Sequence, residues 1–134
     1  MAALLLGLVA GLRTFTAPAM LCLFRRRGGL GYILGVLALL EYGADLDPRA
    51  PARTGPVGLT ARVLGGSFCG WALTAGNGTS PGLNPVFGAC GAVIGAYLGL
   101  AARMRAIELI GTVPAALVED GAAIAAAALI VAYA

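Results

Sequence analysis

Five long apolar runs, separated by short stretches rich in Pro, Gly, Arg or Asp, constrain this chain more than any other feature. The runs cover about residues 2–24, 30–46, 56–75, 85–102 and 113–134. Each has roughly the length that an α-helix needs to cross a hydrocarbon layer about 30 Å thick. None shows the polar–apolar alternation that marks a half-buried strand. We therefore predict an all-α, polytopic membrane protein with five transmembrane helices in a single domain, 1–134.

The composition supports this prediction and excludes other classes. Charged residues make up 11% of the chain, whereas a soluble domain has about a quarter. The basic residues are all arginines, and they form no basic stripe with interleaved aromatics, so we expect no nucleic-acid partner. Cys22, Cys69 and Cys90 lie singly in apolar segments of a chain without histidine. We therefore expect neither a metal site nor a disulfide framework, and no cofactor.

The stretch "GLRTFTAPAM" places a permanent charge inside the first apolar run. A helix that starts at one membrane surface would carry Arg13 about 18 Å inward, close to the middle of the bilayer. Arginine cannot lose its proton, so it needs a counter-charge or water there. Pro18 leaves the Thr14 carbonyl without its helical partner. This carbonyl, with the hydroxyl groups of Thr14 and Thr16, concentrates polar groups around Arg13.

Candidate counter-charges lie in the second and fifth runs. Glu41 and Asp45 share a helix face in the second run, and Glu119 and Asp120 lie in the fifth. An intramembrane charge costs about 2.5–3.5 kcal/mol on insertion scales, so such residues normally face the bundle interior and mark a pathway or relay. We predict a cluster of Arg13, Glu41 and Glu119, with the two aspartates as second choices. The alternative is a purely structural Arg–carboxylate bond.

The remaining arginines have simpler interpretations. Arg62 lies about two turns into the third run, where it either joins the site or snorkels to the surface. The segment 25–27, together with Arg103 and Arg105, is expected to anchor helix ends at the membrane surface. The candidate substrate- or ion-binding residues are therefore Arg13, Thr14, Thr16, Glu41, Asp45, Arg62, Glu119 and Asp120.

Glycines recur every four positions in several runs, which lets helix backbones approach closely in a membrane. The plain interpretation is helix packing, within or between subunits, and we predict a homodimer or other homo-oligomer that packs through the third or fourth run. The glycines predicted to make these contacts are Gly66, Gly70, Gly91, Gly95 and Gly99.

Two short matches suggest an internal repeat. "GLVAGLR" (7–13) is similar to "GAVIGAY" (91–97), and "LLEYGA" (39–44) is similar to "LVEDGA" (117–122). The first two runs would then correspond to the last two. Because one run intervenes, the second pair would be inverted in the membrane, as in many transporters. We predict an inverted 2+1+2 repeat.

Four stretches together resemble a bacterial membrane family catalogued as domain of unknown function 4126. They are "GLRTFTAPA", "ALLEYGADLDP…PARTGPVGLTAR", "GACGAVIGAYLGLAAR" and "ALVEDGAAI", and they cover nearly the whole chain. The resemblance implies a polytopic membrane protein and no established activity. At "GADLDP" the chain departs from the family pattern, because the lysine expected after the first aspartate is missing.

Three functional classes follow from these features. We predict a carrier or channel for a small ion or solute, which uses the Arg/Glu cluster and is coupled to a proton or cation. The alternative is a non-transporting scaffold or lipid-binding assembly protein. An intramembrane enzyme is disfavoured, because the chain has no His, no HExxH motif and no Ser–Lys pair.

The arginine distribution gives an expectation for orientation in a bacterial inner membrane. With five spans, Arg49, Arg53, Arg103 and Arg105 would share a side with the N-terminus, against the segment 25–27 on the other. Arginines near helix ends favour the cytoplasmic side. The count therefore predicts a cytoplasmic N-terminus and an external C-terminus.

Overall fold

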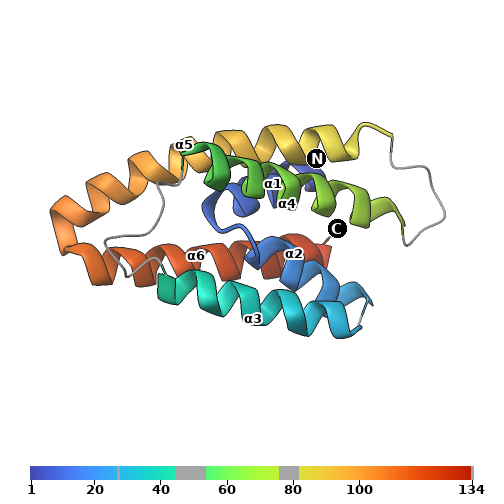
Figure 1. Cartoon of the computed structure of the whole chain (residues 1–134), viewed down its shortest axis with the longest axis horizontal. Helices are drawn as coiled ribbons and strands as arrows, with labels where there is room; N and C mark the ends of the chain where they lie inside the picture. The colour runs from blue at the N-terminus through green and yellow to red at the C-terminus, as the bar shows by residue number, and fades with distance from the viewer. Residues whose placement is uncertain (27, 45–53, 76–81, 134) are drawn as a thin grey trace.

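The computed structural model is all-helical over the residues that it describes, which are 1–26, 28–44, 54–75 and 82–133. Its elements (Figure 1) are α1 (Ala2–Leu12), α2 (Thr16–Leu21), the π-helical turn η1 (Cys22–Arg26), α3 (Gly29–Ala44), α4 (Pro56–Ala75), α5 (Asn84–Ile110) and α6 (Thr112–Tyr133). The all-α prediction is confirmed, and the predicted ranges 30–46, 56–75 and 113–134 lie close to α3, α4 and α6.

The first apolar run is where the prediction of five continuous spans is wrong. α1 ends at Leu12, Arg13 is extended with φ −139° and ψ 115°, and α2 begins at Thr16. Pro18 explains the break, because it has no N–H group with which to continue a helix from α1. In α2 it occupies the first turn, where backbone N–H groups have no helical partner in any case. The run therefore forms two short helices and not one helix over 2–24.

These two short helices form a hairpin that enters the bundle and returns. In Figure 1, α1 runs from the N-terminus toward the middle of the long axis, and α2 with η1 runs back toward the starting end. Ala2 and Leu5 line a cavity together with Leu129 and Tyr133, so the N-terminal residues and the end of α6 are neighbours. The two termini lie at the same end of the molecule. The expected placement of the termini on opposite sides is therefore wrong.

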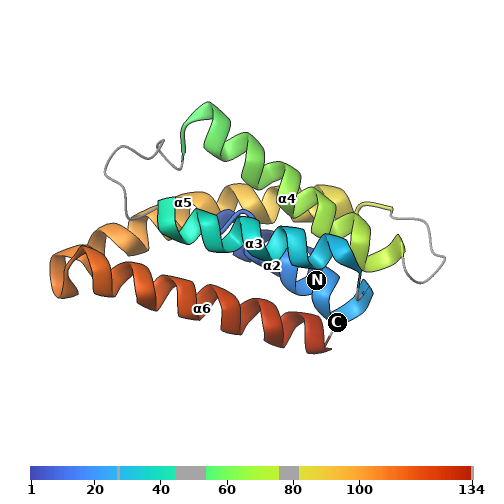
Figure 2. The ribbon, with the colours of Figure 1, turned by 60° about the horizontal axis from the view of Figure 1, so that its bottom comes forward.

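The hairpin occupies the centre of the bundle. α4 and α6 lie on opposite sides of it in Figure 2, and both contact α1 and α2. α5 packs along α1, and α3 packs along α2. The central position explains why α1 and α2 contribute much of the buried core, including the side chains of Leu6, Val9 and Leu21.

Glycine-lined contacts join α1, α4 and α5. A Cβ atom built at Gly7 of α1 or Gly66 of α4 would overlap the backbone of Gly88 in α5. One built at Gly11 would overlap the backbone of Ala92. Helix backbones that touch in this way leave no room for larger side chains. Four of the five glycines predicted for helix packing lie at such contacts within the chain: Gly66, Gly70, Gly91 and Gly95. Gly99, the fifth, packs against the side chain of Leu12.

The predicted inversion between the first and fourth runs is also wrong. Gly91 lies beside Leu4, and Gly99 lies beside Leu12, so residue numbers rise together along the contact. α1 and α5 therefore run in the same direction. The inversion was inferred from a first run that crosses completely, and the hairpin removes that premise.

α5 continues well beyond the predicted end at residue 102. It ends at Ile110, and Gly111, with φ 86°, provides the left-handed conformation that turns the chain into α6. Arg103 and Arg105 of this segment were expected to anchor a helix end at the membrane surface. They lie on a helix that pairs with α6, and this brings Arg103 within reach of Glu119.

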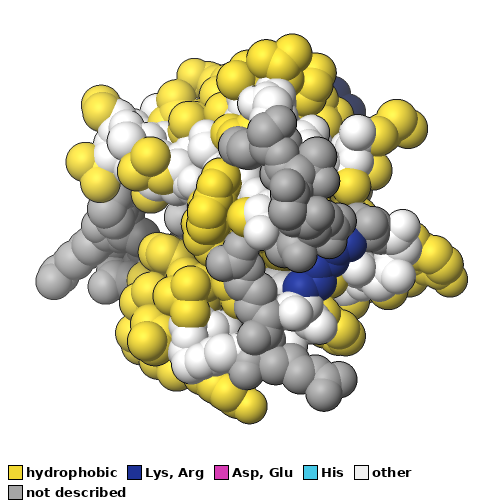
Figure 3. All heavy atoms as spheres, turned by 90° about the vertical axis from the view of Figure 1, so that its right-hand side faces the viewer, with side chains coloured by type: hydrophobic (Ala, Val, Ile, Leu, Met, Phe, Trp, Pro, Cys, Tyr) yellow, Lys and Arg dark blue, Asp and Glu magenta, His cyan; other side chains and the backbone are white. Residues whose placement is uncertain are grey.

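The outside of the molecule is strongly apolar. Exposed Leu, Ile, Val and aromatic side chains lie on all four of the long helices α3 to α6. Within the described residues, α5 and α6 are long and apolar enough to cross a membrane, judged by length and composition. Figure 3 shows the right-hand end of Figure 1, where hydrophobic side chains make up much of the visible described surface and a small basic patch is exposed.

Candidate polar site at the helix break

Arg13 lies at the tip of the hairpin and is fully buried. Its guanidinium pairs with the carboxylate of Asp120 on α6 and lies 5.1 Å from the centre of the Tyr42 ring on α3. Burial of a permanent charge requires such compensation by a counter-charge and an aromatic face. The extended conformation of Arg13 thus places the charge between α3 and α6.

Glu41 of α3 binds the backbone of the helix break. Its Oε1 accepts a hydrogen bond from the Thr14 N–H at 2.9 Å, and its Oε2 accepts one from the Phe15 N–H at 3.1 Å. These N–H groups precede the first turn of α2, where the helix dipole favours a negative charge. One carboxylate therefore satisfies two donors that the broken helix leaves without helical partners.

Tyr42 adds a second link from α3 to the break. Its hydroxyl group lies 2.7 Å from the Thr16 Oγ1 in a hydrogen bond, while its ring faces Arg13. Adjacent residues of α3 thus contact both sides of the turn. Tyr42 was not among the predicted site residues, although its position directly after Glu41 was a usable signal.

Arg62 of α4 points into the same region and does not snorkel. It is 5% exposed, and its Nε donates to the Gly11 carbonyl at 3.0 Å. Carbonyl groups in the last turn of a helix have no helical partner, so a guanidinium is favourable at the end of α1. Its Nη1 donates to the Gly58 carbonyl at 3.1 Å, and its Nη2 lies 3.8 Å from Glu41 Oε1.

A third ion pair joins α5 and α6. Arg103 Nη1 lies 3.4 Å from Glu119 Oε2, and both side chains are nearly buried. The expectation that Arg103 is a surface anchor is therefore wrong. Its spacing of four residues from Gly99 places both on one helix face, and this was the signal that could have identified it.

The structure brings most of the predicted site residues together, but the pairs differ from those predicted. Arg13 pairs with Asp120, which was a second choice, while Glu41 lies beside Arg62 and Glu119 beside Arg103. Glu119 and Asp120 are consecutive, which links the Arg103 pair to the Arg13 pair. Arg13 is followed by Thr14, whose N–H group binds Glu41, and this links the Arg13 pair to the Arg62 pair. Asp45 lies outside the described residues. Within the described part of the chain, no group of metal-ligating side chains gathers.

Comparisons with protein-family models, curated proteins and solved structures find no match. The resemblance to domain of unknown function 4126 therefore stays a prediction. The geometry describes a nearly buried set of paired charges built around a broken helix. Such a set can bind a small charged group by exchanging one ion-pair partner for a ligand, or it can serve only to hold the helices together.

Proposed function

We propose that this chain is an integral membrane protein and that it acts as a carrier or channel for a small ion or solute. The proposed membrane location is supported by the distribution of side chains. Large apolar residues cover the outside, whereas small residues and paired charges fill the inside. A soluble protein shows the reverse arrangement of charge. In the proposed topology α3 to α6 cross the bilayer, and the α1–α2 hairpin enters from one side.

The observation that carries the transport proposal is the buried Arg13 at the tip of a broken helix, paired with Asp120. Transporters commonly place substrate and coupling-ion sites where helices are interrupted within the membrane. Polar residues at that depth normally face a pathway or a proton relay. Glu41 and Glu119 are the groups we propose for coupling to a proton or cation.

The proposal is tested by measuring flux and ligand-induced thermal stabilisation in the native chain and in carboxylate variants. Purified protein is reconstituted in liposomes and screened over small anions and cations, with thermal stabilisation in detergent as a second readout. Glu41→Gln and Glu119→Gln should each lower flux by about tenfold or more, equivalent to at least about 1.4 kcal/mol. Glu108→Gln is the control, since Glu108 is exposed on α5.

Full flux in both Gln variants would overturn the transport proposal. A complete screen without any response, from protein that is folded, would instead favour the second candidate, a non-transporting scaffold or lipid-binding assembly protein. The observation that favours this second candidate is the close glycine packing of α1, α4 and α5, which is typical of a rigid membrane bundle.

The hairpin leads us to propose the opposite orientation in the membrane. With both termini at one end, Arg25 in η1 lies near that end, whereas Arg103 and Arg105 lie in the second half of α5, toward the other end. Arginines near helix ends favour the cytoplasmic side, so we propose that both termini lie on the external side of a bacterial inner membrane. Cysteines added at each end should both label from outside, and labelling of the two ends from different sides would contradict this topology.

A homo-oligomer remains part of the proposal, with a changed interface. The glycine faces of α4 and α5 are used within the chain, so a second copy needs another surface. The outward face of α3, with exposed Tyr32, Val36 and Leu39, is the surface we propose. Light scattering of the detergent-solubilised protein measures the subunit number. A monomer would contradict the proposed homo-oligomer.

A further inference from the structure

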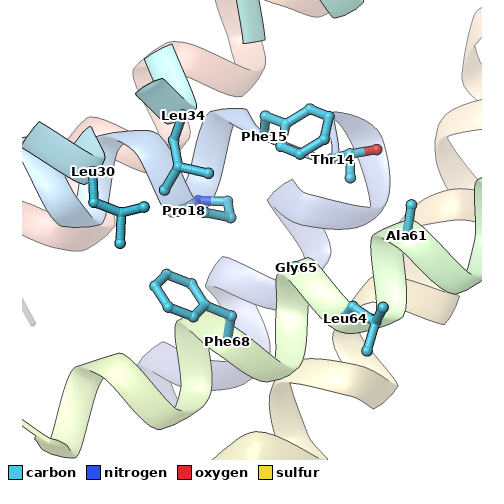
Figure 4. Close-up of a pocket in the computed structure, with 9 residues that line it drawn as sticks. All are labelled: Thr14, Phe15, Pro18, Leu30, Leu34, Ala61, Leu64, Gly65 and Phe68. Carbon is cyan, nitrogen blue, oxygen red and sulfur yellow. The ribbon is translucent and has the colours of Figure 1, made fainter. Parts of the chain in front are cut away.

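Two cavities lie next to one another between α3 and α4. The first, of about 330 Å³ (Figure 4), is lined by apolar side chains that include Pro18, Leu30, Leu34 and Phe68. We call it the apolar cavity. The second, of about 350 Å³, is lined by Glu41, Arg62 and apolar residues up to Ala44 and Val57. We call it the charged cavity. Each has the size of a typical ligand site.

The two cavities share three lining residues, Thr14, Phe15 and Ala61, and so form one groove. Figure 4 shows Phe15 and Ala61 on facing elements at the boundary of the apolar cavity. The boundary is the tip of the hairpin, where the backbone holds Glu41. Any molecule that fills the groove therefore contacts the helix break directly.

The groove is polar at one end and apolar along the rest. Ala44 is the last residue of α3 and Val57 the second of α4, so the charged cavity lies at the ends of these helices. The apolar cavity extends from there toward Leu30, near the other end of α3. At 1.5 Å per residue, α3 covers about 21 Å between Leu30 and Ala44. Half of a bilayer hydrocarbon layer is about 15 Å, so an acyl chain with its glycerol ester region matches this length.

The charges at the polar end select the head group. Arg62 Nη2 and Glu41 Oε1 lie 3.8 Å apart, so a cation and an anion line one small cavity. Guanidinium groups bind phosphate, and carboxylates bind ammonium groups. A head group with both charges complements the pair, whereas a purely anionic head would face Glu41. An isolated ion has no polar partners in the apolar cavity, so a continuous ion path along this groove is disfavoured.

We propose that the groove between α3 and α4 binds one zwitterionic phospholipid, with its phosphate at Arg62, its primary ammonium at Glu41 and an acyl chain in the apolar cavity. The site rests on the proposed membrane location but not on transport. A lipid bound there would press on Phe15 and support the hairpin tip.

Quenching of the chain's one tryptophan tests the site. Trp71 lies next to Phe68 of the apolar cavity, with ring centres 5.9 Å apart. Delipidated protein in detergent is titrated with phosphatidylethanolamine that carries brominated acyl chains. The quenching should saturate near one lipid per chain and should reverse with unbrominated lipid. Ala61→Phe, which fills the boundary, should weaken binding by about tenfold or more.

Two comparisons complete the test. Leu98→Phe is the matched control, because Leu98 is exposed on α5 and lines neither cavity, and it should bind as the native chain does. Brominated phosphatidylglycerol and diacylglycerol should bind about fivefold more weakly or worse.

Quenching that does not saturate, equal binding in Ala61→Phe, or equal binding of the three lipids would each overturn the proposal. If Ala61→Phe does not fold, competition in the native chain decides, and failure of unbrominated lipid to compete overturns it. The assay involves no flux, so its failure is distinct from failure of the transport proposal.

Discussion

The α1–α4–α5 contact and the α3–α4 groove differ in how closely their helices approach. In the first, backbones touch at glycines such as Gly11, Gly66 and Gly88, and an added Cβ would overlap a neighbouring main chain. In the second, two adjoining cavities separate the helices. Gly35 of α3, which lines neither cavity, has open space around it. Both regions border the hairpin, which is close-packed on its α5 side and less so toward the groove.

The two regions should therefore differ in how well they tolerate substitutions. Glycine contacts gain dispersion energy only while both backbones stay in place. The groove is held by polar links, with Glu41 and Tyr42 of α3 bound to the helix break. We infer that substitutions in the close-packed region act on folding, whereas substitutions along the groove act on ligands and on the position of the hairpin tip.

The largest expected effect lies between the two regions, at the Arg13–Asp120 pair. Arg13→Gln should destabilise the fold by about 3–5 kcal/mol, because removing one partner leaves a nearly buried carboxylate without its counter-charge. Thermal unfolding in detergent measures the loss. The double variant Arg13→Gln/Asp120→Asn should recover part of it. A double variant that is less stable than either single variant would show that the two residues do not act as a pair.

Alanine substitutions at two helical glycines should have opposite effects on stability. Gly88→Ala should cost about 1–3 kcal/mol, because the new Cβ meets the Gly66 backbone, which cannot shift freely. Gly35→Ala should be neutral or stabilising by up to about 1 kcal/mol, since alanine is the better helix former. Unfolding midpoints of the two variants check this. Equal midpoints would contradict the assignment of α5 to a close-packed contact.

A smaller effect is expected at the polar link from α3. Tyr42→Phe keeps the ring beside Arg13 and removes only the hydroxyl group that bonds Thr16. We expect a loss of about 0.5–1.5 kcal/mol. Thr16→Val should cost a similar amount, and the double variant should cost less than the sum, because both remove one bond. Additive losses would indicate that the hydroxyl groups act separately.

The smallest effect is expected at Arg25 of η1. Its side chain is exposed and donates one hydrogen bond to the Leu73 carbonyl at 3.2 Å. Arg25→Ala should change stability by no more than about 0.5 kcal/mol and leave flux unchanged. A marked loss of flux would mean that the end bearing the termini contributes to the transport path.

The apolar runs and the charges within them were readable from the sequence because they depend on composition and spacing. The range 56–75 matches α4, and Arg13, Glu41 and Asp120 were identified as nearly buried charges that need partners. The signal for the break was also present, since Pro18 follows Arg13 by little more than one turn. The sequence did not show that the chain turns back at this point, because Pro18 is equally compatible with a kinked helix that crosses the membrane.

Residue type and local spacing are enough to establish that the chain is helical, that apolar side chains dominate it and that its glycines allow close packing. Only the tertiary structure decided that the first run turns back, because Glu41 on α3 supplies the acceptors that make the broken backbone favourable. It also decided that Arg13 pairs with Asp120 and Arg103 with Glu119. Such pairings depend on which helices become neighbours, and contacts between residues far apart in the chain set that arrangement.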